Sequence, residues 1–175
     1  MILVKPRSGT PVKTYFANVE VHNSSTFGIK SDGTNGAVDN AVTDSAFFSM
    51  AGAAVSAVTP AAASPGPPVV RVSLDRATVL NAGAGAVFAN GGGSRVFIIK
   101  SAVEAASTGI TAVNGGNVVL NDSVVTGNGT GVNYSGGGVV ASFGNNAVQF
   151  TGFGACGADV CNGGVAGTMN ALTPK

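Results

Sequence analysis

One short pattern of apolar, polar and small residues recurs five times along this chain, and it constrains the fold more than any other feature. In each copy an apolar residue stands three positions before a small residue, and in all but the first an apolar residue follows two positions later. The copies are Val19–Ser24, Asn40–Ser45, Val72–Ala77, Val96–Ser101 and Val118–Ser123. Their small residues lie at positions 24, 45, 77, 101 and 123, so the steps are 21, 32, 24 and 22 residues. A unit of about 22 residues is therefore repeated in tandem, with one longer insertion.

Each unit begins with apolar residues at alternating positions, as in Val72 and Leu74, which is the period of a β-strand with one buried face. A second short strand is predicted in four units, at Ala53–Val55, Gly85–Val87, Gly109–Thr111 and Gly131–Asn133. Turns rich in Gly and Asn, such as Asn90–Gly93, close the units. Two or three short strands in so short a unit wind into a parallel β-solenoid, whose coils stack about 4.8 Å apart.

We therefore expect an all-β fold, a right-handed parallel β-helix of about five to six coils. Nothing in the composition indicates a second domain, so residues 1–175 are interpreted as one domain with repeats over about 15–150. The longest step contains a Pro-rich segment, 59–68, which cannot join a ladder and is expected to leave the coil as a loop. That loop is either a tolerated insertion or a binding element.

Stacked coils align equivalent residues in columns, and the repeat assigns each column a face. Two columns are predicted to fill the core: Phe47, Val79, Val103 and Val125, and Val21, Val42, Leu74, Ile98 and Leu120. The small column, at a bend of the wall, consists of Ser24, Ser45, Ala77, Ser101 and Ser123. The residues just before it are expected to point outward: Asn23, Asp44, Arg76, Lys100 and Asp122. This register places Asp44 beside Arg76 and Lys100 beside Asp122.

The non-repeat tail, residues 152–175, is expected to cap one end of the solenoid. It holds Cys156 and Cys161, for which a local disulfide or two free thiols are favoured over a metal site. A zinc site needs four ligands, and His22 is the only histidine of the chain. No cofactor and no metal are expected.

Charge and hydropathy exclude several classes of partner. With 9 basic and 8 acidic residues the net charge is +1, so the sequence carries no electrostatic footprint for nucleic acid or an anionic membrane. The apolar run before Lys5, which is Met1 and the three residues after it, is too short for a secretion signal, and four prolines interrupt the uncharged stretch 50–70. The chain as given is therefore expected to be soluble, untargeted and cytoplasmic.

Three segments, Val118–Val132, Ser142–Asn146 and Thr26–Gly33, resemble the bacterial right-handed parallel β-helix proteins of the pectin-lyase-like superfamily. The resemblance covers about residues 15–150 and implies the same fold. Members of that superfamily include enzymes of acidic polysaccharides, phage tailspikes and other repeat proteins, and many of them are extracellular. A lyase of this kind needs clustered carboxylates for calcium and a basic residue to abstract a proton, whereas a hydrolase places two or three Asp on adjacent coils.

The best candidates for such chemistry are Asp75, Arg76 and Lys100 as catalytic residues, with Asp44 and Asp122 as binding residues. The predicted register gathers all five along one edge of the solenoid. Because opposite charges alternate along that edge, a solvated charge ladder is the favoured interpretation.

Aromatic residues and the histidine supply two further candidates. Tyr134, together with Tyr15 and Phe143, could form a platform on which a sugar stacks, with packing in the core or at an edge as the favoured alternative. His22 could act as an acid or base, but the sequence identifies no partner for it, so an exposed polar side chain at a bend is favoured.

The sequence thus favours a non-catalytic structural or binding module whose ligand is a carbohydrate or a protein partner. The alternatives are a polysaccharide lyase or hydrolase with a reduced site, and a fragment of a larger adhesin or tail-fibre protein. The open ends of a solenoid expose unpaired backbone groups, so a homo-oligomer is expected, formed through an end or an apolar flank. Neither nucleic acid nor a membrane is expected as a partner.

Overall fold

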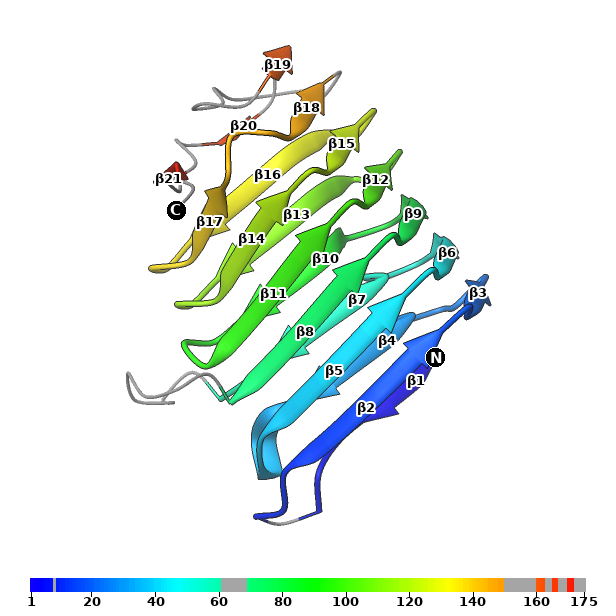
Figure 1. The fold of residues 1–175 in the computed structure, drawn as a ribbon, viewed down its shortest axis with the longest axis vertical. Coiled ribbons are helices and arrows are strands. Elements are labelled where there is room, and N and C mark those ends of the chain that lie inside the picture. Colours follow the sequence, from blue (N-terminus) through cyan, green and yellow to red (C-terminus); the bar gives the residue numbers. More distant parts are fainter. Residues whose placement is uncertain (8, 61–68, 150–159, 163–164, 167–169, 172–175) are drawn as a thin grey trace.

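The computed structural model describes residues 1–7, 9–60, 69–149, 160–162, 165–166 and 170–171 (Figure 1). The chain winds through three parallel sheets as a β-solenoid of about 6 turns, so the predicted all-β fold is confirmed. The only helical element among the described residues is a single 3-10 turn, Gly33–Asn35. No helix in this part of the chain is long and apolar enough to cross a membrane.

From β1 to β18 each coil contributes one strand to each sheet, in the order A, B, C, and the tail strands β19, β20 and β21 then join sheets C, A and B. Sheet A contains β1 (Ile2–Val4), β4 (Ile29–Asp32), β7 (Val55–Val58), β10 (Gly85–Asn90), β13 (Thr108–Val113), β16 (Thr130–Ser135) and β20 (Val165–Ala166). Sheet B contains β2 (Val12–Ala17), β5 (Val38–Thr43), β8 (Val70–Asp75), β11 (Ser94–Ile99), β14 (Asn117–Asn121), β17 (Val139–Ser142) and β21 (Asn170–Ala171). Sheet C contains β3 (Glu20–His22), β6 (Ala46–Met50), β9 (Thr78–Ala82), β12 (Ala102–Glu104), β15 (Val124–Thr126), β18 (Ala147–Gln149) and β19 (Val160–Asn162).

We call the turn from sheet B to sheet C the first bend, that from C to A the second bend, and that from A to B the third bend.

The core lies inside the three sheets, where apolar residues stack in register. The column predicted in sheet C is fully buried: Phe47, Val79, Val103 and Val125. So is that of sheet B: Val42, Leu74, Ile98 and Leu120. Sheet A supplies a third column: Ile29, Val55, Val87, Ile110 and Val132.

The first repeat unit lies in a different register from the one predicted. Val21 pairs with Phe47 in sheet C, whereas Phe16 is the residue that stacks on Val42 in sheet B. The error arose because the alternation of Val19 and Val21 imitates a strand of sheet B. The true strand, β2, places polar Thr14 inside the coil and Tyr15 outside, which weakens its apolar pattern.

The small column therefore starts at Val19 and does not contain Ser24. It is a ladder of hydrogen bonds in which a backbone N–H of one coil donates to a side-chain oxygen of the next. The bonds are Val19 N to Ser45 Oγ (3.1 Å), Ala77 N to Ser101 Oγ (3.0 Å), Ser101 N to Ser123 Oγ (3.2 Å) and Ser123 N to Asn146 Oδ1 (2.9 Å). Small polar residues recur at this bend because they satisfy buried N–H groups as well as fit the space.

Both the first and the second bend use residues in the left-handed backbone region, which turns the wall and points side chains outward. At the first bend these are Asn18, Asp44, Arg76, Lys100 and Asp122, with φ between 48° and 54°. At the second bend they are Asn23, Ser49, Asn81, Ala105 and Gly127, with φ between 52° and 62°. Asn23 thus belongs to the second bend, and Asn18 replaces it in the predicted outward column.

The described parts of the tail add one short parallel strand to each sheet. β19 pairs with β18, β20 with β16 and β21 with β17. Cys161 lies in β19, whereas Cys156 and residues 61–68 of the Pro-rich segment lie outside the described residues.

Candidate functional site

The first bend carries the charged residues singled out in the sequence, and the structure brings three of them together. The Arg76 guanidinium donates from Nε to Asp44 Oδ1 (2.7 Å) and from Nη2 to Asp44 Oδ2 (3.0 Å). Its remaining nitrogen, Nη1, pairs with the carboxylate of Asp75. All three guanidinium nitrogens are therefore engaged by carboxylates of this chain.

These contacts determine what Arg76 and Asp44 can do chemically. The hydrogen bond from Arg76 holds the pKa of the Asp44 carboxyl below its usual range. The same contact raises the Arg76 pKa above its ordinary value. A side chain acts as a general base only in its unprotonated form. Because these contacts stabilise the protonated guanidinium, they oppose proton abstraction by Arg76.

The other candidate residues do not join this cluster. Lys100 and Asp122 occupy successive positions of the same column, yet no ion pair joins them among the pairs that described residues form. Tyr134 lies in β16 on sheet A and packs against the core. Tyr15 is 68% exposed on β2, and Phe143 follows β17 at the far side of sheet B, so the two form no common platform.

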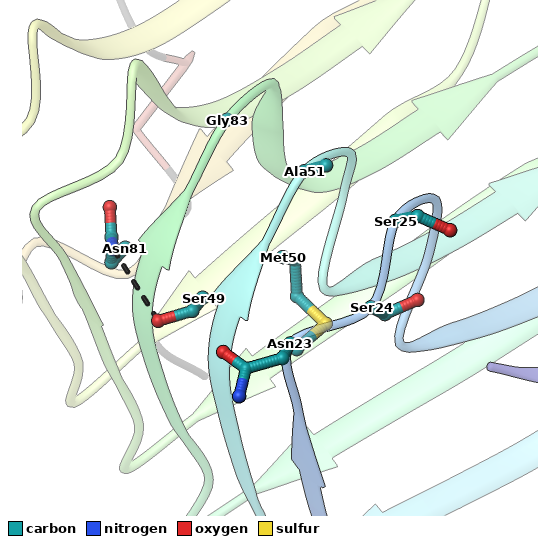
Figure 2. Close-up of a pocket in the computed structure, with 8 residues that line it drawn as sticks. All are labelled: Asn23, Ser24, Ser25, Ser49, Met50, Ala51, Asn81 and Gly83. Carbon is teal, nitrogen blue, oxygen red and sulfur yellow. Dashed lines mark hydrogen bonds between the residues drawn. The ribbon is translucent and has the colours of Figure 1, made fainter.

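A shallow hollow of about 390 Å³ lies at the second bend, over the first three coils (Figure 2). It is lined by Asn23, Ser24, Ser25, Ser49, Met50, Ala51, Asn81 and Gly83, none of which is charged. Three of these residues, Asn23, Ser49 and Asn81, are the left-handed residues of successive coils. Asn81 Nδ2 donates to Ser49 Oγ at 3.5 Å, and the side chain of Met50, which is buried and belongs to the core, reaches toward Asn23. We call these eight residues the second-bend hollow.

Next to the second-bend hollow, the outer face of sheet C carries an aromatic pair. The rings of His22 and Phe48 stack with centroids 4.9 Å apart and an interplanar angle of 24°. Each stands one position before a residue of the hollow, and Leu80, which is 37% exposed, continues the same column. His22 Nε2 also lies 3.3 Å from Glu20 Oε2. The histidine therefore has two partners that its sequence context did not reveal.

The second-bend hollow and its aromatic border suit an uncharged ligand that forms hydrogen bonds. Amide and hydroxyl groups supply both donors and acceptors, and an aromatic face supplies an apolar contact. No carboxylate lines the hollow, and the described residues contain no cluster of three metal-ligating side chains.

Sequence reasoning missed this site because its polar residues lie 26 and 32 positions apart with no local motif. The available signal was the coil spacing itself, since the steps from Asn23 to Ser49 and Asn81 follow the repeat. Comparison with protein-family models, with curated proteins and with solved structures gave no match.

Proposed function

We propose that this protein is a non-catalytic β-solenoid module that binds an uncharged saccharide at the second-bend hollow. The observation that carries the proposal is the stacked His22 and Phe48 pair beside the polar ladder of Asn23, Ser49 and Asn81. A sugar ring presents apolar C–H faces and a rim of hydroxyl groups, which match an aromatic face and an adjacent row of amides.

Charge favours a neutral saccharide over an acidic one at this position. None of the eight residues that line the hollow is cationic, so a uronate carboxylate would lose water without gaining an ion pair. The shallow, open form of the hollow suits a ligand that lies across several coils.

Two observations support the non-catalytic part of the proposal. The Arg76 guanidinium is engaged by Asp44 and Asp75, which opposes its use as a base. The second-bend hollow lacks the paired carboxylates that glycoside hydrolysis requires. Release of unsaturated uronides or of new reducing ends from a polysaccharide panel would contradict this part of the proposal.

Binding is tested with neutral oligosaccharides of glucose, xylose, mannose and galactose, measured by calorimetry against wild type and Phe48→Ala. Loss of the aromatic face is expected to weaken binding about three- to tenfold. Phe97→Ala is the matched control, because Phe97 is another half-buried phenylalanine on an outer sheet face, that of sheet B. Equal affinity in wild type and Phe48→Ala would refute the site.

The polar ladder is tested with Asn81→Asp, which keeps the shape of the side chain and replaces donors with a carboxylate. Its control is Asn114→Asp at the third bend, where the exposed Asn114 also has a left-handed φ, 52° against 60° for Asn81. We expect weaker saccharide binding in Asn81→Asp alone. The same loss in both variants would mean that the effect does not come from the second-bend hollow.

We also propose that the chain is a member of the pectin-lyase-like right-handed β-helix superfamily. The three-sheet coil and the resembling segments support this proposal.

We further propose that the solenoid associates with itself. In support of self-association, β1, β2 and β3 each pair with one neighbour only among the described strands. Such edges accept a further strand. Light scattering at tens of micromolar tests this, and a strictly monomeric mass would count against it.

A further inference from the structure

The outer face of sheet B carries a column of charge that the fold itself does not require. Lys13, Asp39, Arg71 and Arg95 lie directly opposite one another on four successive strands. Their neighbours in sequence point inward, so all four side chains face outward, and Lys13 and Arg71 are exposed. We call these four residues the basic column.

The basic column is not electrically balanced. Asp39 contacts Arg71, with Oδ2 and Nη1 4.0 Å apart, and Arg95 belongs to none of the ion pairs that the described residues form. Only one acidic residue of the chain, Asp159, lies outside the described residues. On its other side Arg95 faces the uncharged Asn117. The column therefore contains one acidic residue, Asp39, and three basic residues.

Placing Arg71 directly opposite Arg95 costs stability, because like charges on neighbouring strands repel at a spacing of about 4.8 Å. The apolar columns inside the coil already set the register, so the fold gains nothing from this juxtaposition. A hollow of about 240 Å³ borders the first three members of the column: it is lined by Lys13, Asp39 and Arg71 together with apolar residues at and beside the third bend, and Arg95 is not among its lining residues. Arg71 therefore borders this space, whereas the unneutralised charge lies at Arg95, the next residue of the column.

We propose that Arg71 and Arg95 together bind a phosphate or sulfate group. Two guanidinium groups on adjacent strands can converge on one tetrahedral dianion, and each offers a planar fork of donors to its oxygens. The contact from Asp39 to Arg71 is long, so most of the donors of Arg71 stay available. This site lies on a different sheet from the second-bend hollow and does not depend on the proposed saccharide.

Binding is measured by calorimetry on the full chain with inorganic sulfate and inorganic phosphate, at constant ionic strength set with sodium chloride. Arg95→Gln and Arg71→Gln are each expected to weaken binding about tenfold. Lys100→Gln is the control, since it removes one exposed cation at the first bend and leaves sheet B unchanged. A sugar phosphomonoester is the third probe. If it binds more tightly than free phosphate and its binding depends on Arg95 in the same way, the bound phosphate group belongs to an ester.

Thermal unfolding adds a measurement that distinguishes anion binding by Arg95 from a purely structural role of this residue. Without the anion, Arg95→Gln is expected to melt about 1–3 °C above wild type, because repulsion is removed. In saturating sulfate the order reverses, because only wild type gains from the ligand. Unchanged anion binding in Arg95→Gln, or an equal loss in Arg95→Gln and Lys100→Gln, would overturn the proposal.

Discussion

The hydrogen-bonded ladder at the first bend makes a prediction in which two substitutions have opposite signs. Ser101 Oγ accepts from the N–H of Ala77 and donates to the carbonyl of Ile99 at 2.7 Å. Ala77 occupies the same column but has no side-chain oxygen, and among the described residues no hydrogen bond from the backbone N–H of Ser45 is present. The ladder is therefore complete at position 101 and broken at position 77.

Ser101→Ala leaves the buried N–H of Ala77 without a partner, which costs about 1–3 kcal/mol of unfolding free energy. Ala77→Ser supplies the missing oxygen to Ser45, and its hydroxyl can donate to the carbonyl of Asp75 as Ser101 does to that of Ile99. We expect it to stabilise the protein by about 0.5–1.5 kcal/mol. The added atom takes the place that Ser101 Oγ occupies one coil later, so no repacking is required.

Urea unfolding followed by far-ultraviolet circular dichroism measures both effects, and each kcal/mol corresponds to about 2–4 °C in melting temperature for a chain of this size. The double variant, Ala77→Ser with Ser101→Ala, separates the two ladder bonds. The reasoning is refuted if Ser101→Ala stays within about 0.5 kcal/mol of wild type, or if Ala77→Ser destabilises the protein.

Three further predictions concern charge, backbone and core. Burial of the Asp32 carboxyl raises its pKa, but hydrogen bonds from Thr34 and two nearby lysines outweigh this and hold the pKa below its usual value. Asp32→Asn should therefore be less stable than wild type at neutral pH, and urea titrations should show the difference shrink as pH falls below about 4. Gly138→Ala should cost more than about 2 kcal/mol in urea unfolding, because its new Cβ would overlap a backbone carbonyl of the preceding coil. Phe47→Ala should cost about 3–5 kcal/mol, whereas Phe48→Ala, on the outer face of the same strand, should cost well under half of that in the same assay.

The columns of the core could be predicted because each depends on local pattern and on a nearly constant step. Val79, Val103 and Val125 each stand two positions after a small residue, so one correct assignment places all three. The first coil was assigned wrongly because Val19 and Val21 repeat the spacing of a sheet B strand by chance. The pairing of Val21 with Phe47 emerges only when neighbouring coils are seen together.

The candidate site was predicted less well than the fold. The contact between Asp44 and Arg76 was anticipated, because both precede the small column by one residue. The second-bend hollow was not, because its contributors are ordinary polar residues with no motif.

The sequence by itself determined the class of fold and the face of most strands. The alternation of apolar and polar residues and the repeat of about 22 residues can both be read from short stretches of sequence. A parallel coil is the fold in which every such strand buries its apolar face. Only the tertiary structure decided which side chains meet, since stacking brings residues from different coils within about 5 Å. The left-handed bends then point residues such as Asn81 and Arg76 out of the wall. Asn81 thereby reaches the hydroxyl of Ser49, and Arg76 the carboxylate of Asp44, because each pair lies on adjacent coils.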